Sequence, residues 1–163
     1  MATNPLPTTN EGYVPIGLRE PIIRFDSREI SLLVVDENFS LTYASRAAGE
    51  RVTAPHIHRH TEAFYVLDGA LTFEVGAERE TITLGAGGFV AVPPGVAHSF
   101  RIAGGHAARW LIIHASDGGF AAFMRGVRDG VKVEWDMAPV PLDGGLPADH
   151  AIVRRPPAEP PSS

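Results

Sequence analysis

Three histidines and a glutamate lie close together in the segment PHIHRHTE, residues 55–62. His56 and His58 are two residues apart and Glu62 follows four residues later, so an extended chain points all three to the same side. His60 has the same parity, and only a turn directly after it would rotate it away. Imidazole nitrogens and a carboxylate oxygen are typical ligands of a divalent transition metal. The segment therefore predicts a metal site at His56, His58 and Glu62, and the role of His60 stays open.

A fourth histidine follows a tight turn downstream, in the segment GGFVAVPPGVAH of residues 87–98. The turn around Pro93, Pro94 and Gly95 reverses the chain, so His98 enters the next strand facing whatever that sheet encloses. Three imidazoles and one carboxylate suit iron, manganese, nickel, copper or zinc, whereas calcium or magnesium would require more oxygen ligands.

The elements that must position these ligands are short and strand-like. The chain contains 17 glycines and 14 prolines, too many helix breakers for a helical bundle. Short apolar runs separated by turn residues favour an all-β sandwich or barrel. The predicted strands are 22–25, 30–35, 39–46, 63–67, 71–75, 81–84, 89–92, 97–102 and 109–115.

A single helix is predicted behind the strands. Phe120, Phe123 and Met124 recur at helical spacing, and Asp117 is a candidate N-cap. The apolar face of this helix can pack on the outside of a sheet, or it can cover one end of the barrel beside a cavity. His114, at the end of an apolar run, can reach that cavity or stay in the core.

The chain is expected to form one domain, because its 163 residues fit a single core. The predicted segments are an irregular N-terminal arm (1–21), a barrel core (22–116), a helix (117–128) and a proline-rich C-terminal tail (131–163).

Composition excludes several function classes. The absence of cysteine rules out disulfides, thiolate nucleophiles and iron–sulfur clusters. The net charge of -5, without a long basic run, argues against nucleic acid as a partner. No apolar stretch is long enough to span a membrane, and we expect a soluble cytoplasmic protein that binds a small molecule.

The two motifs together resemble those of the cupins. In the first cupin motif, His-x-His, a glutamate and a glycine follow an upstream glycine, and the matching residues are His56, His58, Glu62 and Gly69, with Gly49 upstream. The second motif is matched by Gly87, Pro93, Gly95 and His98. Two departures exist, because Gly49 lies one residue further from His56 than usual and Ile102 replaces a common asparagine.

This resemblance implies a double-stranded β-helix, a jelly-roll β-barrel that holds one divalent metal through His56, His58, Glu62 and His98. Three neutral imidazoles and one carboxylate leave such an ion with a net charge of about plus one, which stabilises an enolate or phenolate. In six-coordination, two positions stay open for a substrate oxygen and for dioxygen or water. Glu62 can also act as the base that deprotonates the substrate.

Strand parity points further side chains into the barrel behind the ligands, where they would form an apolar wall suited to a flat organic substrate. The candidate substrate-binding residues are Phe64, Val66, Phe100 and Ile102, with Phe73, Trp110 and His60 as additional candidates.

The Gly-Gly-Phe sequence that opens the predicted helix resembles that of single-domain quercetin 2,3-dioxygenase-like cupins. The resulting hypothesis is a metal-dependent dioxygenase that acts on an aromatic or enolisable hydroxylated compound. Alternatives are a metal-dependent isomerase, cyclase or decarboxylase, and a small-molecule-binding cupin without catalysis. Single-domain cupins are commonly dimers, so we also expect a homodimer.

Overall fold

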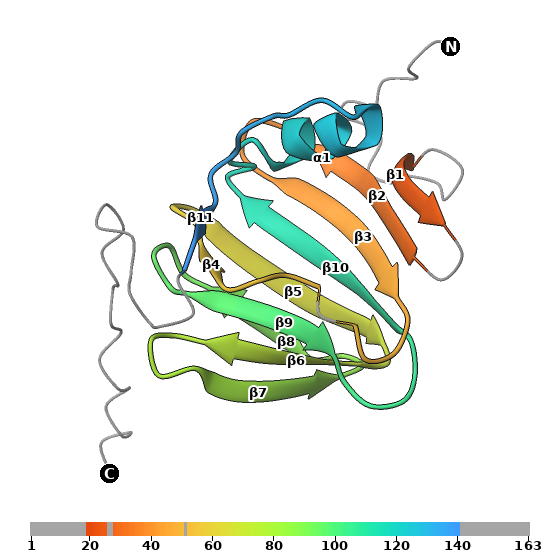
Figure 1. The fold of residues 1–163 in the computed structure, drawn as a ribbon, viewed down its shortest axis with the longest axis vertical. Coiled ribbons are helices and arrows are strands. Elements are labelled where there is room, and N and C mark those ends of the chain that lie inside the picture. The colour runs from red at the N-terminus through yellow and green to blue at the C-terminus, as the bar shows by residue number, and fades with distance from the viewer. Residues whose placement is uncertain (1–18, 26–27, 51, 141–163) are drawn as a thin grey trace.

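The computed structural model describes residues 19–25, 28–50 and 52–140 of the chain. Two antiparallel sheets face each other and form a barrel with one helix above it (Figure 1). The predicted all-β class with one short helix is confirmed. The predicted arm is described only from residue 19, and residues 141–163 of the predicted tail lie outside the described residues.

The larger sheet contains six strands in the order β1-β2-β3-β10-β5-β8. Their bounds are β1 Glu20–Phe25, β2 Arg28–Val35, β3 Ser40–Arg46, β5 Thr61–Asp68, β8 Phe89–Val92 and β10 Ala108–Ala115. The smaller sheet contains five strands in the order β11-β4-β9-β6-β7. Their bounds are β4 His56–Ile57, β6 Ala70–Val75, β7 Glu80–Gly85, β9 His98–Ile102 and β11 Ala138–Pro139.

Each predicted strand corresponds to an observed strand, with the same bounds for β8 and with one or both ends shifted for the others, whereas β4 and β11 were not predicted. These two strands have two residues each, which is too short for a hydrophobic pattern to mark them. Strands distant in sequence become neighbours, because β10 lies between β3 and β5, and β9 lies between β4 and β6. This interleaving brings the two histidine motifs together.

Alternation along β10 decides which side chains enter the barrel. Ala108, Trp110, Ile112 and His114 are buried, and the residues between them are half-buried or exposed. The strand register aligns His114 with Glu62 on β5. Inward-facing side chains therefore form rows across the sheet, and one of these rows contains both His114 and Glu62.

An aromatic cluster fills the barrel interior. Phe64 lies against Phe73 and Phe100, with ring centroids 5.0 and 4.9 Å apart, and Trp110 meets Phe100 edge-to-face at 5.7 Å. All four rings are almost fully buried. Their burial makes this cluster the main hydrophobic core and fixes the relative position of the two sheets.

The helix α1 spans Phe120–Asp129, three residues later at its start than predicted. Asp117 is not its N-cap, because Gly119 holds that position in a left-handed conformation. The Asp117 carboxylate still accepts a hydrogen bond from the backbone amide of Ala121 at 3.1 Å. The buried face of α1 packs against Ile22 and Leu32, so the helix covers the outer strands of the larger sheet.

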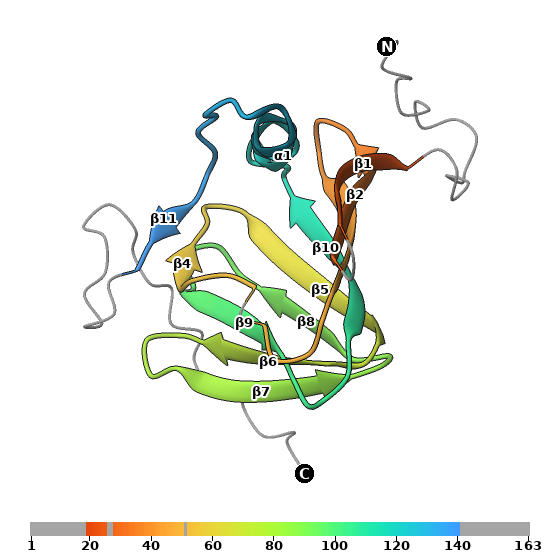
Figure 2. The same cartoon turned by 45° about the vertical axis from the view of Figure 1, so that its right-hand side comes forward.

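Residues 131–137 form no helix or strand, in keeping with the predicted irregular tail, whereas Ala138–Pro139 form the strand β11. After α1 the chain returns along the barrel, and β11 pairs with β4 (Figure 2). Trp135 stacks on Phe123 with centroids 5.4 Å apart, and the Asp136 amide donates to the Gly118 carbonyl at 2.9 Å. This return brings Trp135 and Asp136 to the histidines. Among the described residues, no helix has the length and apolar character needed to cross a membrane.

Candidate metal centre

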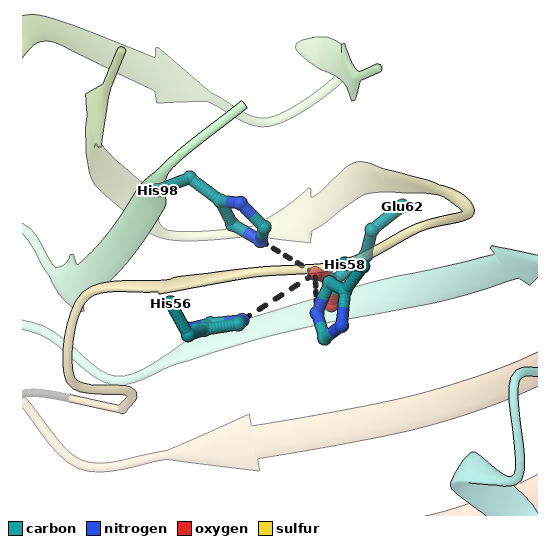
Figure 3. A group of neighbouring side chains, drawn as sticks. All are labelled: His56, His58, Glu62 and His98. Atoms are coloured by element: carbon teal, nitrogen blue, oxygen red, sulfur yellow. Dashed lines mark hydrogen bonds and ion pairs between the residues drawn. The ribbon is translucent and has the colours of Figure 1, made fainter. Parts of the chain in front are cut away.

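The four predicted ligands converge inside the barrel. His56, His58, Glu62 and His98 point toward one another (Figure 3), and each offers one ligand atom within 4.8 Å of the others. All four side chains are buried. They come from both sheets, because β4 supplies His56, β5 supplies Glu62 and β9 supplies His98. The cluster therefore depends on the closed barrel.

Local backbone geometry places each ligand. His56 pairs directly with His98 in the register of β4 and β9. The chain then bends at residues 59–60 before β5 begins, which changes the simple alternation and separates His60 from the ligand group. The turn before His98 is fixed by Gly95, whose φ of 77° favours glycine and whose amide donates to the His58 carbonyl at 2.8 Å. The second motif is thus hydrogen-bonded to the first.

Backbone carbonyls determine the tautomer of the three histidines. The Nδ1 atoms lie 2.7 Å from the Ala54 carbonyl for His56, 2.5 Å from the Asp136 carbonyl for His58, and 3.0 Å from the Val96 carbonyl for His98. A carbonyl oxygen only accepts, so each Nδ1 must donate its proton. The neutral rings therefore present an Nε2 lone pair, as a metal-binding histidine does.

All three lone pairs face the same carboxylate oxygen. The Nε2 atoms of His98, His58 and His56 lie 2.6, 3.1 and 3.8 Å from Glu62 Oε2. Nitrogen lone pairs and an anionic oxygen repel one another unless a proton or a metal cation lies between them, and His98 Nε2 is within hydrogen-bond distance of Glu62 Oε2. His58 Nε2 is buried and has no hydrogen-bond partner among the described residues. Because imidazole and carboxylate donors suit a divalent transition metal, the cluster fits such an ion.

The electrostatics of the cluster differ between its members: they favour an ionised Glu62 and a neutral His56, but a protonated His98, which must lose that proton before it binds a metal. Burial raises the pKa of Glu62, but the surrounding histidines outweigh it and hold that pKa well below its usual value. Burial lowers the pKa of His98, and the contact with Glu62 more than reverses this, so the pKa is raised. Desolvation lowers the pKa of His56. Glu62 is therefore ionised at neutral pH and His56 is neutral, as metal ligands must be.

Residues 43–114 match the Cupin_2 family, described as a cupin domain. The chain has a cupin fold. The family match over these residues and the structural neighbours agree on this fold, and the buried His/Glu cluster fits the metal site of a cupin. No curated protein matches the chain by sequence.

Solved structures show the same fold at low identity. An RmlC-like cupin from Methanocaldococcus jannaschii aligns with a TM-score of 0.51 and 17% identity, covering 58% of this chain and 85% of that one. KdgF from a Halomonas species aligns at 0.55 and 16%, covering 66% and 96%. The iron(II) form of HppE aligns at 0.53 and 19%, covering 64% and 62%. These similarities concern the barrel.

Two further histidines lie beside the His/Glu cluster of this barrel. His114 Nε2 lies 3.2 Å from Glu62 Oε1, the carboxylate oxygen that does not face the other ligands, and its ring stacks on Phe120 at 4.0 Å. His60 Nδ1 lies 2.9 Å from the carboxylate of Asp136. The sequence left the position of His114 open, and strand parity alone could not reveal its pairing with Glu62.

A cavity of about 310 Å³ adjoins the cluster. His56 and Glu62 form part of its wall, so a molecule in the cavity reaches the predicted metal position. The rest of the wall is mainly apolar and includes three residues of α1, which therefore covers the cavity as well as the larger sheet. The other lining residues are Ile30, Arg46, Val52, Thr53, Ala54, Pro55, Phe100, Ile112, Phe120, Phe123, Met124, Trp135, Met137 and Pro139.

Of the seven predicted substrate-binding residues, one lines the cavity and the other six lie elsewhere. Phe100 lines the cavity. His60 lies beside Asp136, outside the cavity wall. The remaining five candidates belong to the packed core behind the cavity; parity predicted the inward facing of Phe64, Val66 and Ile102, and left that of Phe73 and Trp110 open. These five are Phe64, Val66, Phe73, Ile102 and Trp110.

Proposed function

We propose that this cupin is a metal-dependent oxygenase of the quercetin 2,3-dioxygenase-like kind, acting on an aromatic or enolisable hydroxylated compound. The observation that carries the proposal is the position of the His/Glu cluster. Three Nε2 lone pairs and one carboxylate oxygen converge at the wall of an apolar cavity of about 310 Å³. A cluster open to a cavity of this kind favours catalysis over a closed structural site.

The cavity wall determines which molecules enter. The side chains of Phe100, Ile112 and Trp135 exclude water and favour a flat apolar compound. His56 and Glu62 form the polar part of the wall beside the metal position, so a hydroxylated end of the substrate is directed there. A bound iron, manganese, nickel, copper or zinc ion would stabilise the deprotonated substrate oxygen and accommodate dioxygen.

Glu62 is assigned a second role, as acceptor of the proton from the substrate hydroxyl. It lines the cavity and its carboxylate is ionised, the state that a base requires. Glu62→Gln keeps an oxygen ligand and removes the base. We expect a metal content close to that of the wild type and turnover reduced about 10²- to 10⁴-fold. Normal turnover with normal metal content would contradict the base role.

The proposed function is tested with protein purified without chelators. Elemental analysis identifies the metal, and oxygen uptake is followed with a panel of flavonols and other phenols. We expect substrate consumption that requires both oxygen and metal, and that stops after chelation. Turnover without oxygen would contradict the oxygenase and favour a metal-dependent isomerase, cyclase or decarboxylase. Saturable binding without product, in metal-loaded protein under air, would favour a binding protein.

We further propose that the protein acts as a homodimer in the cytoplasm. Tyr65 and Phe89 are paired across β5 and β8 and are exposed, together with Leu67. Exposed apolar side chains grouped on one sheet face are typical of a contact surface. Light scattering should give twice the monomer mass, and a monomer at micromolar concentration would contradict the dimer.

A further inference from the structure

The cavity has a second polar end, away from the metal ligands. Ser40, His114 and Glu62 form one row across β3, β10 and β5. Arg46 lies at the other end of β3, six residues from Ser40, or about 20 Å of strand at about 3.3 Å per residue. Arg46 nevertheless lines the same cavity as Glu62. The cavity therefore extends from the metal ligands toward this arginine.

The Arg46 guanidinium is buried with little compensation. The residue is 6% exposed, and within the described part of the chain its only polar partner is Glu50, with Nη1 3.5 Å from Oε2. The Glu50 side chain is 42% exposed, so solvent weakens this contact. Arg46 Nε has no hydrogen-bond partner among the described residues. Burying a cation with so few partners costs folding free energy, and the protein groups around Arg46 do not offset this cost.

Arg109 shows how an exposed arginine of this barrel is accommodated. It follows Ala108, the residue on β10 that pairs with Arg46. Arg109 lies on the outer face of β10, and its side chain is 56% exposed and pairs with Asp68 at 3.2 Å. Arg46 points to the inner face, as the alternation of β3 requires. The cavity wall contains two more polar atoms that are buried and lack partners among the described residues, Thr53 Oγ1 and Trp135 Nε1.

We propose that Arg46 binds a carboxylate group of the molecule that occupies the cavity. A guanidinium presents two parallel N–H donors that match the two oxygens of a carboxylate, and the apolar surroundings strengthen such a pair. The ligand class is then a hydroxylated aromatic or enolisable acid, with its hydroxyl group at the metal end and its carboxylate at Arg46. The position of the hydroxyl group rests on the proposed function, whereas the carboxylate site rests on Arg46 itself.

The test uses 4-hydroxyphenyl-alkanoic acids of increasing chain length, each compared with its uncharged carboxamide. Binding is followed by tryptophan fluorescence, because Trp135 lines the cavity. We expect at least one acid to bind about 10- to 100-fold more tightly than its amide, as a charge-assisted hydrogen-bond pair predicts. Arg46→Met should lower the affinity for the acid to that for its amide and so abolish this preference, and Arg46→Lys should restore part of it.

The matched control is Arg109→Met, which removes an arginine from the outer face and should leave the preference intact. Thermal unfolding distinguishes a ligand-binding role of Arg46 from a structural role. Arg46→Met should not lower the melting temperature, because it removes an incompletely paired buried charge, whereas a structural arginine would lower it.

Repeating the titrations after chelation separates this proposal from the metal-dependent function. If only the metal assignment fails, the acid preference persists with and without metal. If a carboxylate binds at the metal instead, the preference survives Arg46→Met and disappears on chelation, which overturns the Arg46 site. Equal affinity for every acid and its amide in the wild-type protein also overturns it.

Discussion

The same strands build two different regions inside the barrel, a polar metal end and an apolar packed end. On β5, Glu62 is followed on the inner face by Phe64, and on β9, His98 is followed by Phe100. On β10 the change runs in the opposite chain direction, from His114 to Ile112. Two residues along each strand are enough to pass from ligand to core. The metal end is thus held by strands that the packed end keeps rigid.

The two regions are stabilised in different ways. At the packed end, aromatic rings fill the space, and the one polar atom of the four rings, Trp110 Nε1, is buried without a partner among the described residues. At the metal end, backbone carbonyls orient the histidines, but within the described part of the chain Nε2 of His58 and both ring nitrogens of His114 lack hydrogen bonds. Buried polar atoms of this kind are normally satisfied. The packed end is therefore filled almost entirely by protein atoms that need no partner, whereas a cation would complete the metal end.

The comparison predicts its largest effect for a change at the metal end. His98→Ala removes an imidazole whose tautomer is set by the Val96 carbonyl. We expect metal affinity to fall by more than the 10- to 100-fold typical of residues that only orient a ligand, with loss of turnover. Elemental analysis after dialysis measures this. His106→Ala, at an exposed loop position, is the control, and equal metal content in both variants would contradict the assignment.

A change at the packed end should reduce stability instead of metal binding. Phe73→Ala removes a fully buried ring from the aromatic cluster, and we expect the free energy of unfolding to fall by about 3–5 kcal/mol. The protein that remains folded should still bind one metal per chain. Denaturant titration with Phe25→Ala as the exposed control measures the difference, and a metal-free folded form of Phe73→Ala would show that the two regions are not separable.

The two regions also differ in how far the sequence predicts them. The ligand cluster follows from His-x-His spacing and from the turn before His98, because both are local. Inward parity was correct for Phe64 and Val66, but in a barrel the inner face includes both core and cavity wall, and parity does not give depth. Trp135 and Asp136 were not predicted, since their role depends on a return of the chain that pairs β11 with β4.

A third, smaller effect is expected at Gly118, which lies between the His/Glu cluster and helix α1. Gly118 has a φ of +60°, and a Cβ there would lie 2.5 Å from the His60 ring. Gly118→Ala should therefore displace His60 from Asp136 and lower stability by about 1–3 kcal/mol. Gly104→Ala is matched in φ but meets no atom within 4 Å, so it reports the backbone strain alone. Equal melting temperatures for the two variants would exclude the contact as a cause.

The smallest effect is expected at the ion pairs that connect helix α1 to β1. Arg125 of α1 donates to the Glu20 carboxylate at 2.7 Å, and Arg128 donates to it at 2.8 Å. The hydrogen bond from Arg125 is the main cause of the lowered pKa of Glu20, and burial opposes it. Because the folded pKa lies below the unfolded value near 4.5, this stabilisation is complete above that pH and is lost as the pH falls through the folded pKa.

Glu20→Gln should therefore lower the free energy of unfolding by at most about 1 kcal/mol at pH 7, since the pair is partly exposed. The difference from the wild type should shrink as the pH falls below about 4.5, whereas Glu37→Gln, at an exposed turn position, should show no difference at either pH. Urea titrations at pH 7 and pH 3.5 measure both. If Glu20→Gln loses the same free energy of unfolding at both pH values, Glu20 acts through packing. The attachment of α1 then does not depend on charge, as at the packed end.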